Sequence, residues 1–166
     1  MSRSGVGSLL LIAVVAFLLL RPWEGEEATP PAQARAVVTR VVDGDTFEAR
    51  IGGGVEDVRL IGVDTPETVK PGEPVQCFGP QASGYAHREF GGRRVRLVLG
   101  AERRDVYGRL LAYAYIGHRF LNAELLRRGL ARTLAIPPNT RYSERFGRLE
   151  LRAARAGRGL WGACPP

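Results

Sequence analysis

Acidic and basic side chains gather in three short clusters of this sequence, at residues 42–47, 59–68 and 105–109. Carboxylate and carbonyl oxygens are the hard ligands that Ca²⁺ takes in proteins. Guanidinium groups bind phosphate through paired N–H donors, and a carboxylate can orient or deprotonate a water molecule. A metal site, a base and two phosphate clamps together meet the needs of phosphodiester hydrolysis.

The individual residues suggest how these roles divide. Asp45 and Asp64 each stand where a predicted strand meets a loop, so two barrel strands could bring their carboxylates together as Ca²⁺ ligands. Arg59 alternates with apolar neighbours and should project from the other face of its strand, towards the same mouth. There it could clamp a phosphate together with Arg109, and Glu67 supplies the carboxylate for water.

Each cluster also has a structural explanation. Asp43-Gly44 between strands is a strong hairpin signal, and residues 64–67 and 107–109 could be polar turns at strand ends. The combination, rather than any one cluster, favours a site. His87 and His118 are expected to face solvent instead of acting in catalysis.

The elements that would carry the clusters follow from apolar periodicity and turn signals. Strands are predicted at residues 36–42, 47–51, 57–63, 94–99 and 110–116, and helices at 79–90, at 122–128 with Asn122 as its cap, and between 143 and 157. Five strands with an inserted helix predict an α+β fold, namely a five-stranded OB-fold β-barrel with about three packed helices.

The net charge is +7 and the pI is about 10.2, and Lys70 is the only lysine among 24 basic residues. A basic domain favours nucleic acid or an anionic membrane surface as its partner. A genome rich in G and C would also raise the arginine count, so charge alone decides nothing.

The N-terminus predicts export. Residues 6–20 form an apolar run of about fifteen residues, which suits a signal peptide and is short for a spanning helix of roughly 17–25. We therefore expect a signal or anchor segment at 1–20, a linker at 21–35, the main domain at 36–162 and a tail at 163–166. Ala32-Gln33-Ala34 is the only cleavage-like motif and lies far from the run, so cleavage and retention as a membrane anchor both stay open.

Two cysteines agree with an oxidising compartment. We expect a disulfide between Cys77 and Cys164 that ties the C-terminal tail to a loop. The sequence has no Cys/His cluster, which argues against zinc.

The motifs DGDTF, R-(4)-DTPE and DxYGR, in this order, resemble the signature blocks of the thermonuclease (staphylococcal nuclease-like) family. Residues 79–83 and 129–131 resemble its first-helix entry and second-helix end, so the likeness spans 37–161. It implies an OB-fold enzyme that cuts DNA and RNA at the 5′-side P–O bond and leaves 3′-phosphates.

The resemblance also implies roles for single residues. Asp45 and Asp64 would be the calcium carboxylates with the Thr65 carbonyl beside them, and Asp43 would lie near the metal. Glu67 would activate water. The phosphate contacts would come from Arg59, Arg109 and the Tyr107 hydroxyl.

This sequence departs from the family's best-studied member in two places. Residues 132–137 contain no aromatic ring where that member has aromatic residues that stack on a nucleobase, and Val106 stands where it has a lysine. We expect a changed KM before any loss of turnover.

The main prediction is thus an exported Ca²⁺-dependent endonuclease of low sequence specificity. It would act as a monomer on single-stranded or locally opened DNA and RNA, with the membrane as a second partner through residues 6–20 if these are kept. The alternatives are a non-catalytic nucleic-acid-binding OB-fold module and a membrane-anchored structural domain.

Overall fold

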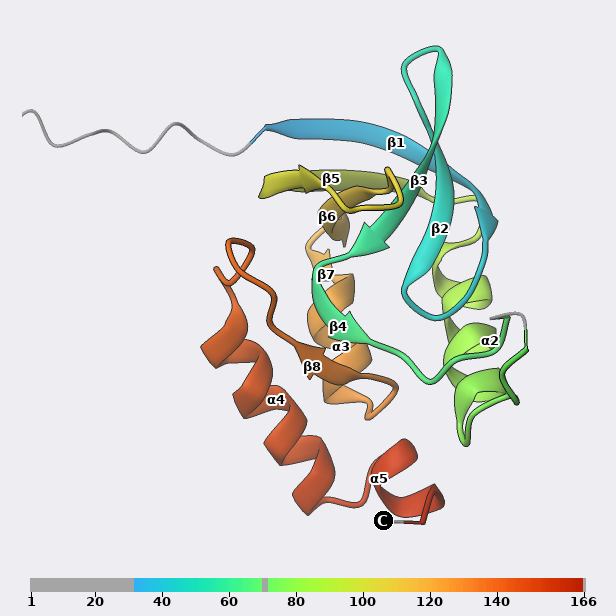
Figure 1. Cartoon of the computed structure of the whole chain (residues 1–166), viewed down its shortest axis with the longest axis vertical. Coiled ribbons are helices and arrows are strands. Elements are labelled where there is room, and N and C mark those ends of the chain that lie inside the picture. The colour runs from blue at the N-terminus through green and yellow to red at the C-terminus, as the bar shows by residue number, and fades with distance from the viewer. Residues whose placement is uncertain (1–31, 70–71, 166) are drawn as a thin grey trace, which may run out of the picture. The chain divides into compact units, whose positions relative to one another are not determined.

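The computed structural model describes residues 32–69 and 72–165 (Figure 1). The expected signal or anchor segment, and all but the end of the linker, lie outside these residues. Within the described part of the chain, no helix is both long and apolar enough to cross a membrane.

Five strands close into a barrel. They pair in the order β3-β2-β1-β5-β6, and the parallel pairing of β3 with β6 joins the two edges, while the other neighbours run antiparallel. The two-residue strand β7 extends the sheet beyond β6. The bounds are β1 (Gln33–Val41), β2 (Thr46–Ile51), β3 (Gly54–Leu60), β5 (Arg94–Arg104), β6 (Leu110–Ile116) and β7 (Arg119–Phe120). The predicted five-stranded OB-fold barrel is confirmed.

Helices pack against the barrel and complete the α+β architecture (Figure 1). The core joins both layers, because Phe47 of β2, Phe90 of the first described helix and Phe146 of a later one are all fully buried. Pro80 near the start of the first of these helices and the glycine pair after its end set its limits as predicted. The helices are α2 (Gly79–Phe90), α3 (Leu121–Arg127), α4 (Ser143–Arg155) and the short α5 (Leu160–Ala163).

The strand predicted at 57–63 is broken in two. β3 ends at Leu60, and β4 (Gly62–Asp64) pairs instead with β8 (Arg132–Leu134). Gly62 makes the break possible, because its φ is +78° and a Cβ there would lie 2.6 Å from the Phe146 ring. The new direction carries the chain from the barrel to Asp64, at the end of β4, and to Thr65, the first residue of the loop that follows.

Asn122 does not cap a helix, so that prediction is wrong. α3 begins one residue earlier, at Leu121, and Asn122 is fully buried within it. Its Nδ2 donates to the Ile61 carbonyl at 2.8 Å, and its Oδ1 accepts from the Ala114 amide at 3.0 Å. Asn122 hydrogen-bonds two buried main-chain groups, which would otherwise be left without partners, and this favours its buried position over a capping position. One of these groups belongs to Ile61, the residue between β3 and β4.

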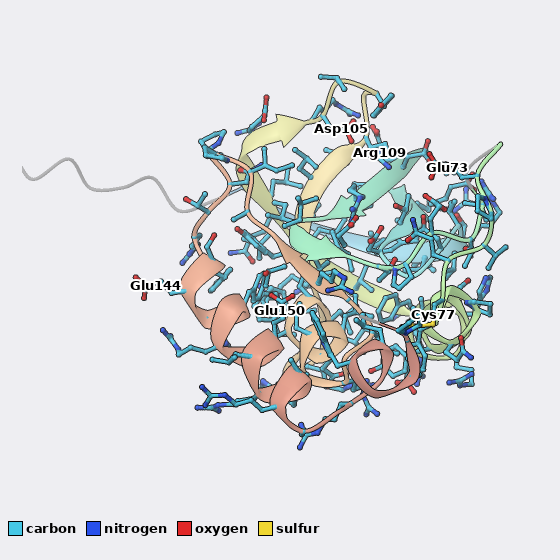
Figure 2. All side chains as sticks on the ribbon, turned by 60° about the horizontal axis from the view of Figure 1, so that its bottom comes forward. Glu73, Cys77, Asp105, Arg109, Glu144 and Glu150 are labelled. Carbon is cyan, nitrogen blue, oxygen red and sulfur yellow. A yellow bond between two sulfur atoms is a disulfide. The ribbon has the colours of Figure 1, made fainter. Side chains whose placement is uncertain are left out.

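Cys77 and Cys164 are joined by a disulfide across 87 positions of sequence, with Cα atoms 5.8 Å apart. The bond ties the loop before α2 to the C-terminal tail (Figure 2, where Cys77 is labelled). Gln76, beside Cys77, forms two hydrogen bonds with the main chain of Glu67. Its amide donates to the Glu67 carbonyl at 2.9 Å, and its Oε1 accepts from the Glu67 amide at 3.0 Å.

Candidate active site

The turn between β1 and β2 is held by Asp43. Its Oδ1 accepts from the amides of Asp45 at 3.0 Å and Thr46 at 2.7 Å, a local side-chain turn. Gly44 allows the close approach of the next loop, because a Cβ there would lie 2.7 Å from the Thr65 side chain. The structural explanation of this cluster is therefore correct as far as it goes, and the turn also aims Asp45 inward.

Asp45 is a buried carboxylate, only 3% exposed. Its Oδ2 accepts from the amide and the hydroxyl of Thr65, at 2.6 and 2.9 Å, and its Oδ1 lies 2.8 Å from Arg59 Nη1. Burial is the largest influence on its pKa and raises it to about 7, against the opposing effects of the Arg59 charge and the Thr65 hydrogen bonds. A further positive charge beside this carboxylate would relieve the cost of burying it.

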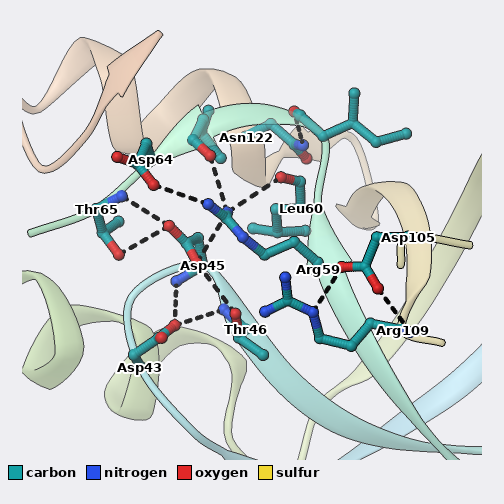
Figure 3. A network of polar contacts seen from close by, with 12 residues as sticks. Asp43, Asp45, Thr46, Arg59, Leu60, Asp64, Thr65, Asp105, Arg109 and Asn122 are labelled. Atoms are coloured by element: carbon teal, nitrogen blue, oxygen red, sulfur yellow. Dashed lines mark hydrogen bonds and ion pairs between the residues drawn. The ribbon is translucent and has the colours of Figure 1, made fainter. Parts of the chain in front are cut away.

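Arg59 bridges the two predicted calcium ligands (Figure 3). Nη1 pairs with Asp45, and Nη2 pairs with Asp64 Oδ1 at 2.8 Å. Nη1 also donates to the Val63 carbonyl at 2.8 Å. A main-chain carbonyl of β4 therefore helps to fix the guanidinium of this β3 residue next to both carboxylates.

The oxygen groups fit a hard divalent cation. The Asp45 and Asp64 carboxylates meet at one guanidinium, and Thr65, whose carbonyl was the third predicted ligand, is bonded directly to Asp45. The Asp64 side chain is about half exposed, so the group is open to solvent on one side. Among the described residues, no group of three or more acidic, histidine or cysteine side chains is placed to hold a metal ion by itself. Calcium accepts carbonyl and water oxygens beside carboxylates, which suits this open set.

Glu67 shapes the loop that follows Thr65. Its Oε1 accepts from the amides of Thr68 and Val69, both at 2.8 Å, and its main-chain amide donates to the side chain of Gln76. These two hydrogen bonds turn the carboxylate towards the main chain of its own loop.

The third cluster is a turn organised by Asp105. Its Oδ1 accepts from the amides of Tyr107 and Arg109, both at 3.0 Å, and its Oδ2 accepts from Arg109 Nε at 2.7 Å. Within the described residues, the two terminal amino groups of Arg109 have no hydrogen-bond partner, so they remain available to an anion. Figure 3 shows Arg109 beside Arg59.

A pocket of about 310 Å³ joins the second and third clusters. Arg59, Arg109 and Tyr107 line it, and so do Leu134 and Ile136 from the segment that follows α3. Tyr107 is 81% exposed, and its ring lies 5.3 Å from the Arg109 guanidinium carbon. The predicted phosphate-binding residues are thus neighbours in space, on one concave surface.

Three residues that line this pocket were not predicted to contribute to a site. One is Asp105, although the spacing of an aspartate four residues before an arginine could have indicated the pair. The others are Leu134 and Ile136, which form an aliphatic wall where the sequence showed only the lack of a ring. His87 and His118 are exposed and lie outside this pocket.

Comparison with known proteins places these residues in a wider group. The profile described as staphylococcal nuclease homologue matches residues 57–163. The thermonuclease of Staphylococcus hyicus is 34% identical over 167 residues, and that of Staphylococcus intermedius is 37% identical over 166; each match covers 97% of this chain and 99% of the relative. The SPbeta prophage-derived endonuclease YokF of Bacillus subtilis is 39% identical over 124 residues, which cover 74% of this chain and 42% of YokF.

Proposed function

This chain belongs to the staphylococcal nuclease family, and we propose that it is an exported, calcium-dependent endonuclease that hydrolyses the phosphodiester bonds of DNA and RNA. One observation carries the proposal: Arg59 lines the same pocket as Arg109 while touching both Asp45 and Asp64. Phosphate clamps and metal carboxylates therefore meet in one place, as phosphodiester hydrolysis requires.

Asp45, Asp64 and the Thr65 carbonyl would hold the Ca²⁺. When bound, the ion supplies positive charge next to the scissile phosphate and lets Asp45 stay ionised. Arg59 and Arg109 bind the phosphate oxygens and stabilise the charge that grows as phosphorus becomes pentacoordinate.

Glu67 orients the attacking water and takes its proton. The new bond joins the water oxygen to phosphorus, the P–O5′ bond breaks, and the 5′-oxygen leaves with a proton from solvent. The products are a 3′-phosphate and a 5′-hydroxyl. Tyr107, which lines the pocket, would donate its hydroxyl to a neighbouring phosphate.

The pocket accepts a nucleotide of a single strand or of an opened duplex. Its aliphatic wall, Leu134 and Ile136, can cover a base but offers no ring for stacking. Low sequence specificity follows, because aliphatic contacts do not read the hydrogen-bonding edges of bases.

Digestion of a single-stranded oligodeoxynucleotide tests the proposal. The protein should cut in millimolar Ca²⁺, stop in excess chelator and leave 3′-phosphate ends by mass spectrometry. An Arg109→Gln variant should lose activity at unchanged fold, while Arg152→Gln, on the exposed part of α4, serves as the matched control. Binding of the strand without any cleavage would refute the proposal and support the alternative, a non-catalytic nucleic-acid-binding module.

Export is tested separately, by mass spectrometry of the N-terminus of the natively produced protein and by its location after cell fractionation. A full-length chain in the cytoplasmic fraction would contradict it.

A further inference from the structure

Four arginines gather on the barrel away from the candidate active site. Arg35, Arg50, Arg94 and Arg96 line a hollow of about 600 Å³ together with Tyr115, and we refer to these five residues as the arginine groove. All four arginines are exposed to solvent. The lining shares no residue with the pocket that holds Arg59 and Arg109.

Strand register places these side chains on one face. Arg50 of β2 lies opposite Val37 of β1, which lies opposite Arg94 of β5. In the next row, Arg35 of β1 lies opposite Arg96 of β5, which lies opposite Tyr115 of β6. Because directly paired residues share a face, and so do residues two apart on one strand, the groove crosses four adjacent strands.

The charge of the groove is uncompensated. Among the described residues, no acidic side chain lines it, and none of its four arginines forms an ion pair. Elsewhere on the barrel exposed arginines do pair, as Arg104 does with Glu56 at 2.9 Å. Like charges directly opposite in a sheet, such as Arg35 and Arg96, oppose folding. An anion bound across them would remove that repulsion.

Arg96 is held in a fixed plane. Its guanidinium carbon lies 4.2 Å from the centre of the Tyr115 ring, and the same ring stacks on Phe120 with centroids 4.6 Å apart. A guanidinium lying on an aromatic ring keeps its N–H donors in the plane, where they can meet phosphate oxygens bidentately. The groove is therefore partly organised before any ligand binds.

We propose that the arginine groove binds the phosphodiester backbone of a nucleic-acid strand whose other part lies in the active site. This inference rests on the proposed nuclease function and extends it to a second, non-catalytic contact that favours long substrates. We favour a nucleic acid over a membrane surface, because insertion into a membrane uses large apolar side chains and this lining offers little apolar area, namely the partly exposed Val37 and Tyr115.

One strand can reach both places. On β2, Thr46 beside the active-site turn and Arg50 in the groove are four residues apart, which is about 13 Å. On β6, Leu111, which lines the active-site pocket, and Tyr115 are likewise four residues apart, which is about 13 Å. OB-fold proteins cover about 4–16 nucleotides of a single strand, so an oligonucleotide spans this separation while a dinucleotide does not.

The test compares Arg35→Gln/Arg94→Gln with the control Arg152→Gln/Arg155→Gln, which removes the same charge from exposed positions of α4. Binding of a 30-nucleotide DNA strand is measured in full-length protein carrying Glu67→Gln, which prevents cleavage, across a salt series. Each lost backbone contact should lower the slope of log K against log salt by about 0.7, so the groove variant should lose about 1.4. Its thermal midpoint should not fall, because repulsion is removed.

Hydrolysis of a dinucleotide, measured with Glu67 intact, should be equal in the groove variant and the parent. The proposal is overturned if both double variants change the salt slope equally, or if the groove variant keeps the parental slope. It is also overturned if the groove variant loses binding to vesicles of anionic phospholipid but keeps its affinity for DNA. Failure of the nuclease proposal looks different, since the parent would then cut neither substrate while groove-dependent DNA binding could persist.

Discussion

Replacing Ile136 by tyrosine should give the pocket the ring that its wall lacks. Ile136 is 57% exposed and Leu134 is 39% exposed, and both face the pocket that Tyr107 and Arg109 also line. A larger side chain at position 136 therefore extends into open space instead of overfilling the core, where it would disturb packing. The barrel should keep its stability.

The expected gain follows from stacking less its entropic cost. A base on an aromatic ring contributes about 1–3 kcal/mol, and ordering the side chain costs about 0.5–1.5 kcal/mol. The central values leave a net of about 1 kcal/mol, which corresponds to roughly 5-fold tighter binding of a single strand. Asp45, Asp64 and Arg59 are untouched, so kcat should stay within about twofold, given that stacking acts on substrate and transition state alike.

Fluorescence anisotropy with a labelled oligonucleotide, in the Glu67→Gln background with Ca²⁺, gives the affinity, and steady-state digestion with Glu67 intact gives kcat and KM. Ile136→Leu is the matched control, because it keeps the aliphatic wall. Equal affinities for the tyrosine and leucine variants, or a changed kcat at constant KM, would refute the placement of a base against this wall.

Three further predictions concern the site and its frame. Glu67→Gln keeps an oxygen for the Thr68 and Val69 amides, so digestion assays should show kcat lower by about 10²–10⁴-fold at an unchanged thermal midpoint; nearly full activity would exclude Glu67 as the water-activating group. Replacing Cys77 and Cys164 by serine opens a link across 87 positions and should lower the free energy of unfolding by roughly 4–5 kcal/mol in urea titrations; a loss below about 1 kcal/mol would show that the loop is held by packing alone. Burial raises the pKa of Asp105, but hydrogen bonds and charge from Arg109 outweigh it and hold that pKa below its usual range. The ionised form therefore stabilises the fold above about pH 4, and this contribution disappears as the pH falls further. On acidification below that pH, the free energy of unfolding should fall by about 1 kcal/mol less in Asp105→Asn than in the parent. Identical acid-unfolding curves would contradict the pairing of Asp105 with Arg109.

Local signals predicted the elements whose limits are set locally. α2 begins and ends where Pro80 and the following glycines indicate, and β6 has the predicted bounds because its apolar residues are bounded by turns. β5 runs five residues beyond the predicted end at Leu99, through a register shift. Its extension is polar, and it is held by Asn139, whose side chain bonds both main-chain groups of Glu102. Asn139 lies 37 residues away from Glu102, so no local sequence pattern could predict the extension of β5.

That three of the predicted residues would lie close together was predictable, but their contacts were not. Carboxylates and arginines at strand ends indicated Asp45, Arg59 and Asp64, and the structure brings the three together. The sequence could not show that Arg59 would form ion pairs with both carboxylates, because the position of Asp64 depends on the break of the strand at Gly62. The break in turn depends on Phe146, from a helix more than eighty positions later.

The disulfide also turns most of the domain into a covalent ring. Everything from Cys77 to Cys164, including Arg109 and the wall at Leu134, lies within the closed loop, whereas Asp45 and Glu67 lie on the strand of chain that leads into it. A protease that cuts once inside the ring leaves a nicked molecule whose two pieces remain bonded. A single cut between Glu67 and Cys77 instead breaks the covalent link between Asp45 and Arg109, so resistance to digestion is concentrated on the C-terminal part of the chain.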